Sequence, residues 1–294
     1  MRAIVQPEAG ITPVVQAIRR ARRSIDICIF RLDRREIEGA LSAAVARGVR
    51  VRALVAHTNT GGESRLRKLE QRLLALGIMV TRTADELVRY HGKYMVADDA
   101  LYVFGFNFTK IDIDKSRSFA VGTRDVRTVK EASKLFESDS TRQPYSPARS
   151  NLVVSPETAR EMLVSFIGGA KKDLAIYDVK IQDPPMIKIL KERAAKGVQI
   201  RVIGSLKGAV DQVTVRRLEN SRLHVRAIIR DGTRAFVGSQ SLRKVELDKR
   251  REIGVFINNS AVARQLMQVF ESDWAPRDGA EAVGVSEASS PDAR

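Results

Sequence analysis

The strongest constraint on the fold is an internal repeat. Residues 22–56 (RRSIDICIFRLDRREIEGALSAAVARGVRVRALVA) align without a gap on residues 171–205 (KKDLAIYDVKIQDPPMIKILKERAAKGVQIRVIGS). Each copy reads as an apolar run, a segment with helical apolar spacing, a glycine (Gly48 or Gly197) and a second apolar run. Glycine suits the left-handed position that ends a helix. The pattern therefore predicts a strand–helix–strand unit with parallel strands and a right-handed crossover.

The repeat continues toward the end of each half. The segment KLFESD (134–139) matches QVFESD (268–273), and each closes a predicted helix. Between the copies, residues 140–151 are rich in proline and serine and poor in apolar residues, which is typical of a linker. We therefore predict two similar α/β halves, 1–140 and 151–274. Residues 275–294 are small, polar and unpatterned, which predicts a disordered tail.

Two of the three histidines begin similar motifs at equivalent places in the repeat. Residues 91–107 read HGKYMVADDALYVFGFN, and residues 224–240 read HVRAIIRDGTRAFVGSQ. Apolar runs broken by DD or DG predict a β-hairpin in each half. Each motif holds a histidine, a cation and an aspartate at the same spacing: His91, Lys93 and Asp98, then His224, Arg226 and Asp231.

A histidine beside a cation suits the chemistry of a phosphate ester. Positions i and i+2 of a strand share a face, so each histidine projects on the same side as its cation. The cation binds non-bridging oxygens, and the imidazole attacks phosphorus or moves a proton. Cleavage of a phosphodiester benefits from two imidazoles, one that attacks and one that protonates the leaving oxygen. A solitary strand histidine is usually structural, but a duplicated one at equivalent positions favours catalysis.

We therefore expect the halves to pack as a pseudo-twofold pair around one cleft. His91 and His224 should face that cleft with imidazoles about 4–7 Å apart, so that attack and protonation are in line. Neither motif offers ligands with metal-binding spacing, so no metal is predicted. Asn107 and Gln240 end the returning strands, where they can lie beside the two pairs.

The doubled motif resembles the signature of the phospholipase D superfamily, H-x-K-x4-D-x6-G-S-x-N or close variants. The matching residues are His91, Lys93, Asp98, Gly105 and Asn107, then His224, Arg226, Asp231, Gly238, Ser239 and Gln240. The resemblance extends from about residue 10 to Trp274. It implies an α/β fold of two α-β-α halves, with mixed, mainly parallel sheets and one shared active-site cleft. It also implies a phosphohistidine intermediate and no metal or other cofactor.

The resemblance also assigns roles to single residues. Each motif aspartate is expected to orient the histidine of the opposite half, which pairs Asp98 with His224 and Asp231 with His91. Glu252 matches an acidic residue that often follows the second motif, and we expect it to support the site. The residues expected to bind the substrate phosphate are Asn107, Ser239 and Gln240.

Three departures from the signature concern the cleft. Arg226 replaces a lysine and keeps its charge, although its planar fork is not equivalent to an ammonium group. Gln240 replaces an asparagine, and Phe106 stands where a small residue is usual and is expected to narrow the cleft.

Charge and composition indicate the class of partner. The net charge of +16 implies an anionic partner such as nucleic acid, a phospholipid surface or a phosphate-bearing substrate. A single cysteine, Cys28, rules out an internal disulfide and fits a reducing compartment. Neither a signal peptide nor a run of about 18 apolar residues is found. We expect a cytoplasmic monomer that can contact an anionic membrane peripherally.

Three functions fit these observations. The leading prediction is a metal-independent phosphodiesterase or phosphatidyltransferase acting on phospholipids, as the phospholipase D and cardiolipin synthase branches do. The first alternative is an endonuclease of the same superfamily, favoured by the net charge. The second alternative is a non-catalytic lipid- or nucleic-acid-binding scaffold with a decayed site. Only the departures from the signature at Arg226 and Phe106 support it.

Overall fold

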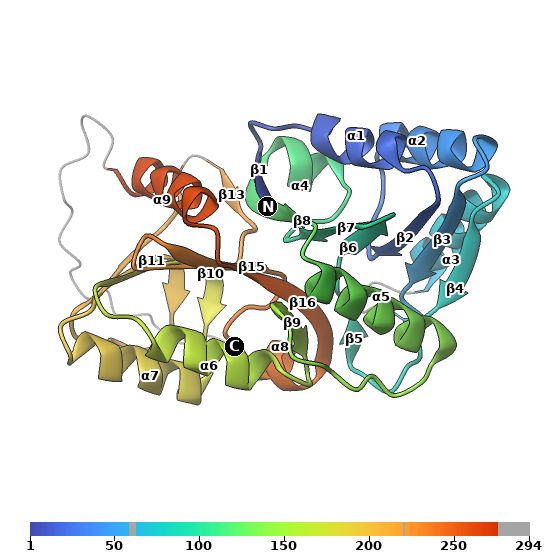
Figure 1. Ribbon diagram of the computed structural model, residues 1–294. Coiled ribbons are helices and arrows are strands. Elements are labelled where there is room, and N and C mark those ends of the chain that lie inside the picture. Colours follow the sequence, from blue (N-terminus) through green and yellow to red (C-terminus); the bar gives the residue numbers. More distant parts are fainter. Residues whose placement is uncertain (59–62, 220, 276–294) are drawn as a thin grey trace, which may run out of the picture.

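The protein consists of two mixed β-sheets side by side, each flanked by helices (Figure 1). The computed structural model describes residues 1–58, 63–219 and 221–275. Apart from Ala275, the predicted tail 275–294 lies outside the described residues. The two sheets confirm the prediction of an α/β fold with two similar halves.

The first half begins with the N-terminal strand and ends with a long helix. In chain order its elements are β1 (Arg2–Gln6), α1 (Thr12–Arg20), β2 (Ser24–Ile29), α2 (Arg35–Ala46), β3 (Arg50–Val55), α3 (Ser64–Ala75), β4 (Met79–Arg82), β5 (Arg89–Tyr90), β6 (Tyr94–Ala97), β7 (Ala100–Phe104), α4 (Lys110–Asp114), β8 (Ser116–Thr123) and α5 (Val126–Thr141).

The second half repeats this order with one helix fewer among the described residues, because its second and third parallel strands follow each other directly. Its elements are β9 (Leu152–Ser155), α6 (Ala159–Gly168), β10 (Asp173–Ile181), α7 (Pro184–Ala194), β11 (Gln199–Leu206), β12 (Val213–Arg216), β13 (Arg222–Leu223), β14 (Ala227–Arg230), β15 (Arg234–Gly238), α8 (Lys244–Asp248), β16 (Arg250–Ile257) and α9 (Ser260–Trp274).

The repeated segments form the strand–helix–strand units that the sequence predicts. β2 pairs in parallel with β3, and β10 pairs in parallel with β11. Gly48 and Gly197 follow α2 and α7 with φ of +81° and +83°, the left-handed conformation that favours glycine. These two units place corresponding strands at corresponding positions in the two sheets.

The prediction of mainly parallel sheets is wrong. The first sheet has the order β1-β8-β7-β6-β2-β3-β4, and the second has the corresponding order β9-β16-β15-β14-β10-β11-β12. In both, the pairs made by the motif hairpin and the strand after it are antiparallel, and these outnumber the parallel pairs in the described sheets. The hairpin motif causes the difference, because a tight turn always reverses the chain.

Each half donates one short strand to the sheet of the other half. β5 pairs with the start of β16, where Arg89 and Tyr90 lie opposite Arg250 and Arg251. In the same way β13 pairs with the start of β8. The residue after β5 is His91, and the residue after β13 is His224. The exchange therefore carries each motif histidine to the edge of the opposite half.

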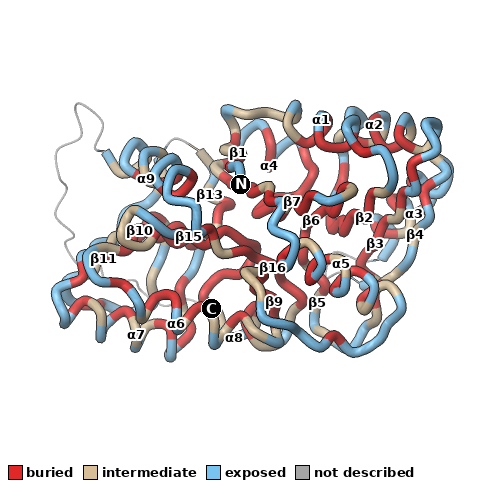
Figure 2. The backbone as a smooth tube through the Cα atoms, in the orientation of Figure 1, coloured by how far each residue is buried: buried red, intermediate tan, exposed pale blue. Residues whose placement is uncertain are grey.

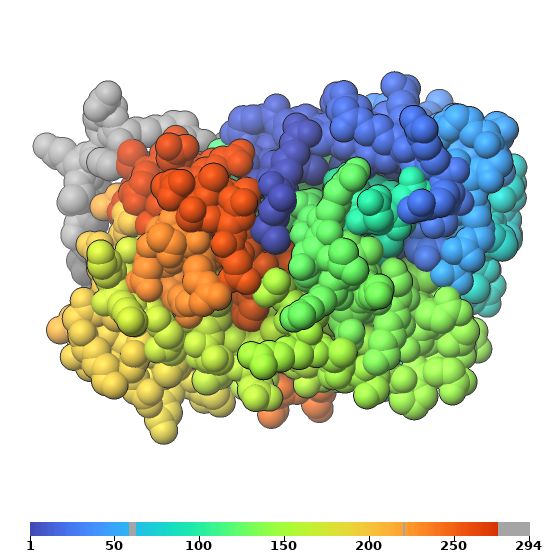
Figure 3. Space-filling model, in the orientation of Figure 1, coloured from blue at the N-terminus to red at the C-terminus, as the bar shows by residue number. Residues whose placement is uncertain are grey.

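Three hydrophobic layers hold the elements together. One lies between the first sheet and α1, α2 and α3, and a second lies between the second sheet and α6 and α7. The third joins the two halves, with Phe119 packed edge-on against Tyr177 at 5.4 Å. Figure 2 shows the buried backbone concentrated in the sheets, and Figure 3 shows the two halves in direct contact.

The repeated FESD segments explain how the halves are clamped. Asp139 on α5 binds Arg251 on β16 at 3.1 Å, and Asp273 on α9 binds Arg117 on β8 at 2.8 Å. Each ion pair therefore joins one half to the other, and both lie next to the exchanged strands. Among the described residues, no helix has the length and apolar character needed to cross a bilayer.

Candidate active site

His91 is held by the second half of the protein. Its backbone N–H donates to the carbonyl of Arg251 at 2.8 Å, which places the imidazole beside Glu252 on β16. The imidazole Nδ1 lies 3.0 and 2.9 Å from the two carboxylate oxygens of Glu252, which is fully buried. A carboxylate only accepts, so Nδ1 carries the proton and Nε2 keeps its lone pair. This is the tautomer that a nucleophilic imidazole needs.

His224 is held by the first half in a related way. Its backbone N–H donates to the carbonyl of Arg117 at 3.1 Å. The residue after Arg117 is Ser118, however, so the carboxylate that serves His91 has no counterpart at this position. Asp112 on α4 takes its place, with Oδ2 3.6 Å from the imidazole Nδ1. Each histidine therefore has a carboxylate from the opposite half.

Asp112 and Arg222 are site residues that the sequence analysis missed. Asp112 accepts from the side-chain amide of Asn107 at 2.7 Å and from Arg222 at 2.6 Å, in addition to facing His224. The signal that could have found Asp112 is the match between KIDID (110–114) and KVELD (244–248), which puts an acidic residue at the same place in both halves.

A cation lies beside each histidine. Lys93 is 1% exposed, and its Nζ donates to the His91 carbonyl at 2.8 Å and lies 2.9 Å from the His91 Nε2. Arg226 donates to the His224 carbonyl at 3.2 Å and to Ser241 Oγ at 3.2 Å. Each cation contacts its own histidine, but residues 91–93 and 224–226 lie between two strands and not on one strand as predicted. The lone pair of His91 faces an ammonium group.

Burial controls the titration of the site. Loss of hydration, with Lys93 and Arg226 nearby, holds the pKa of His91 well below 6.5, and burial together with Arg226 lowers the pKa of His224. Burial lowers the pKa of Lys93 to about 7 and raises that of Glu252. Both imidazoles are therefore neutral at pH 7 without substrate, and a bound phosphate anion would raise their proton affinity.

The expected pairing of the motif aspartates with the histidines is wrong. Asp98 accepts from the backbone N–H groups of residues 22–24 at 2.8 to 3.0 Å, and Asp231 accepts from those of residues 171–173 at 2.7 to 3.2 Å. Each sits in the turn of its hairpin, and the carboxylates beside His91 and His224 are those of Glu252 and Asp112. Each motif aspartate therefore holds its hairpin turn against the residues that precede β2 or β10. Neither is the carboxylate that contacts a histidine.

The turn of the second hairpin is one residue longer than that of the first. The residues after the two turns therefore do not correspond at equal distance from their histidines. Ala97 pairs with Ala100 across a two-residue turn, whereas Arg230 pairs with Arg234 across a three-residue turn. The extra residue shifts everything after the second turn. The backbone N–H of Asn107 donates to Asp112, and that of Ser241 donates to Glu246, so Ser241 is the counterpart of Asn107.

Three residues expected at the cleft do not line it, and two of them, Ser239 and Gln240, follow the extra turn residue. Gln240 is buried and its amide donates to the Val153 carbonyl at 3.0 Å, so it faces the core of the second half. Ser239 is buried and exchanges hydrogen bonds with the backbone of Ile253. Phe106 is also fully buried, packed 5.5 Å from Phe104, and does not narrow the cleft. Asn107 alone of the three expected phosphate-binding residues lines it.

One cavity of about 600 Å³ has both histidines in its wall. The prediction that they face one cleft is thereby confirmed, and the expected separation of their imidazoles stays a prediction. Counting the described residues, the wall also contains six cations and two carboxylates. The lining residues are Phe30, Arg31, Leu32, Asp33, Arg65, Leu66, Lys68, Leu69, Arg72, Arg89, His91, Asn107, Thr109, Ile111, Asp112, Arg222 and His224.

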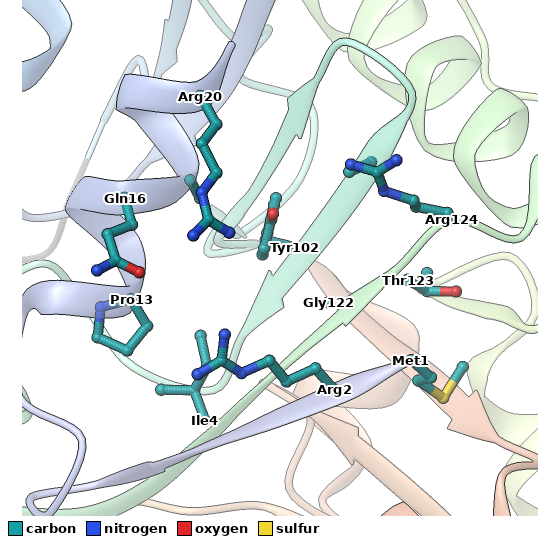
Figure 4. A pocket seen from close by; sticks show the side chains of 12 residues that line it. Met1, Arg2, Ile4, Pro13, Gln16, Arg20, Tyr102, Gly122, Thr123 and Arg124 are labelled. Carbon is teal, nitrogen blue, oxygen red and sulfur yellow. The ribbon is translucent and has the colours of Figure 1, made fainter.

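A second cavity, of about 270 Å³, lies between α1 and the far end of β8 (Figure 4). Arg2, Arg20 and Arg124 line it together with Tyr102, whose ring lies over Gly122, and Figure 4 shows Arg20 reaching from α1 toward that ring. Its wall, within the described residues, contains neither a histidine nor a carboxylate. Of these two cavities, only the one of about 600 Å³ therefore contains candidate acid–base groups among its described residues.

Comparison with known families agrees with this geometry. A family model described as "Cardiolipin synthase, PLD-like domain" matches residues 14–140 and 163–274. The chain belongs to this PLD-like domain family. Members of the wider superfamily act on phosphodiesters. Among the described residues, no group of three or more His, Cys, Asp or Glu side chains is arranged to hold a metal ion.

Solved structures share the fold of this PLD-like protein. Polyphosphate kinase from Porphyromonas gingivalis matches with a TM-score of 0.76 and 18% identity, over 94% of this chain and 50% of the kinase. The chain thus spans half the length of that enzyme. Phosphatidylserine synthase from Haemophilus influenzae Rd KW20 matches with a TM-score of 0.68 and 12% identity, over 93% of this chain and 85% of the synthase. No curated protein matches the sequence.

Proposed function

We propose that this PLD-like protein is a phosphodiester hydrolase or transferase that acts through a phosphohistidine and without a metal ion. The observation that carries the proposal is the wall of the 600 Å³ cavity, where His91 and His224 occur together and each faces a carboxylate from the opposite half. Two such imidazoles supply a nucleophile and an acid–base group to one phosphate.

In the first step, Nε2 of His91 attacks phosphorus and the bond to the leaving oxygen breaks. His224, carrying a proton, donates it to that oxygen. In the second step, His224 takes a proton from water or an alcohol, whose oxygen attacks phosphorus, and the P–N bond breaks. His91 is assigned as the nucleophile because its carboxylate contact is shorter, at 2.9 Å against 3.6 Å.

The remaining polar residues fit the binding of a phosphate. Lys93 and Arg226 can stabilise the charge on its non-bridging oxygens as phosphorus becomes five-coordinate. Asn107 lines the cavity, and its side-chain amide nitrogen, which donates one hydrogen to Asp112, has a second hydrogen that can donate to a phosphate oxygen. Lys93, Arg226 and Asn107 are therefore the proposed phosphate-binding residues. Ser239 and Gln240 are not among them, because both are buried away from the cavity.

The chemistry is the same for a phospholipid, which the sequence analysis favours, and for a nucleic acid. The first test therefore uses bis(p-nitrophenyl) phosphate, a diester with a good leaving group, with EDTA present. We expect turnover by the wild type and its loss in both His91→Ala and His224→Ala. Wild-type turnover that both variants retain would refute the assignment. No turnover of this diester, of mixed phospholipids or of DNA would support a non-catalytic scaffold.

A further inference from the structure

The cleft is asymmetric although the fold is nearly symmetric. Of the described residues in its wall, only Arg222 and His224 come from the second half. The others come from the first half, chiefly from the end of β2 and from α3. In the second half β11 runs on to β12 with no helix between them in the described residues, so α3 has no counterpart there. Substrate bound at the histidines must therefore extend over the first half.

A basic stripe follows α3 along this cleft. Arg65, Lys68 and Arg72 stand three and four residues apart, which puts them on one side of the helix. They are exposed, while Leu66 and Leu69 beside them are buried against the first sheet. Arg72 binds Glu38 at 3.0 Å. Among the described residues, neither Arg65 nor Lys68 forms an ion pair, so their charges are available to a ligand.

The stripe fits a chain of phosphates better than a single lipid head group. Helix residues three apart have Cβ atoms roughly 5–6 Å apart, so Arg65 and Lys68 can contact neighbouring phosphates of one strand. Acyl chains need an exposed apolar wall. Within the part of the wall that the structure describes, Ile111, at 51% exposed, is the one large apolar side chain that is strongly exposed.

The cleft also favours a single strand over a duplex. The side chains of His91 and His224 are 12% and 11% exposed, so the scissile phosphate must enter the cleft to reach them. Among the described residues of the wall, the only aromatic one other than histidine is Phe30, which is buried and packs edge-on against His91 at 4.6 Å. Without an exposed ring for base stacking, binding depends on phosphate contacts and carries little sequence preference.

We propose that α3 is a phosphate-binding wall for a single nucleic-acid strand, which places the scissile phosphate between His91 and His224 and the adjacent phosphates beside Arg65 and Lys68. The substrate class named here rests on the proposed function. Binding measurements test the phosphate-binding wall without any turnover. The wall and the proposed function can therefore be refuted independently.

The experiment compares two double variants with matched charge and spacing. Arg65→Ala/Lys68→Ala removes the stripe, and Arg127→Ala/Lys130→Ala removes an exposed arginine and lysine three residues apart on α5, away from the cleft. Binding of a fluorescein-labelled oligothymidylate is measured by anisotropy over a salt series, in a His91→Ala background that keeps the strand intact. Turnover of the oligonucleotide and of bis(p-nitrophenyl) phosphate is measured with His91 present.

The stripe variant should bind at least tenfold more weakly, and its salt slope should fall by about 1.4, the value for two lost phosphate contacts on a single strand. In the same variant, the ratio of kcat/KM for the oligonucleotide to kcat/KM for the small diester should also fall. The control variant should keep the wild-type affinity for the oligonucleotide and the wild-type ratio. Equal losses in the control, or oligonucleotide binding that the stripe variant leaves intact, would overturn the proposal. Binding to anionic vesicles but not to the oligonucleotide would also overturn it. Stripe-dependent binding without turnover of either substrate would keep the wall and refute the proposed function.

Discussion

Replacing Asp112 with asparagine tests how the site is built. The change keeps the size of the side chain and removes the charge that faces His224. At an effective dielectric constant of about 20, unit charges 3.6 Å apart interact by about 4.6 kcal/mol. If that attraction stabilises the imidazolium form of His224, its loss lowers kcat by up to roughly 10³-fold. The ion pair with Arg222 adds little to stability, since that arginine side chain is 47% exposed.

Asp98→Asn is the matched comparison, because the motif alone assigns Asp98 to His224. In the structure this carboxylate binds three backbone N–H groups in a turn. We expect a loss of about 1–2 kcal/mol in the free energy of unfolding, measured by thermal denaturation, and kcat within about twofold of wild type. Initial rates on bis(p-nitrophenyl) phosphate at pH 7 give kcat for both variants. A kcat loss in Asp98→Asn as large as that in Asp112→Asn would refute the reasoning.

Three further outcomes are expected. Activity should survive EDTA, and complete loss that only an added divalent ion restores would contradict the phosphohistidine route. Because Lys93 binds phosphate as a cation and its pKa is about 7, kcat/KM should fall as pH rises through about 7. In Lys93→Arg the fall in kcat/KM should move to a pH above the assay range, since arginine stays charged. If kcat/KM of Lys93→Arg still falls near pH 7, Lys93 is not the group whose titration causes the fall. Arg226→Lys should stay within about tenfold of wild type, whereas Arg226→Ala should lose roughly 10²-fold in kcat/KM; equal losses in the two would show that the charge is not what matters.

The sequence predicts the fold well because the repeat is a local pattern that occurs twice. Apolar runs and terminal glycines such as Gly48 fix each strand–helix–strand unit, and two copies imply two similar sheets. The exchanged strands were not predictable in this way. Arg89–Tyr90 and Arg222–Leu223 are too short to show any periodicity, and they form only because the opposite half offers a strand edge.

The site was predicted in part, and each error has a physical cause. His91, His224 and their cations were found from the repeated motif, although the structure places them between two strands and not along one. Asp112 lies on a short helix, so its approach to His224 depends on packing between halves. The misplaced Gln240 comes from one extra residue in the second hairpin turn, which an ungapped alignment cannot reveal.

Trapping the covalent intermediate is the most direct test of the account. The His224→Ala variant is mixed with bis(p-nitrophenyl) phosphate, quenched within one turnover and digested for peptide mass analysis. The account predicts release of one equivalent of p-nitrophenol and a p-nitrophenylphosphoryl group on the peptide that contains His91, with no label in His91→Ala. A label on His224 in the His91→Ala variant would reverse the two roles. Turnover by the wild type with no labelled histidine in any variant would contradict the phosphohistidine mechanism.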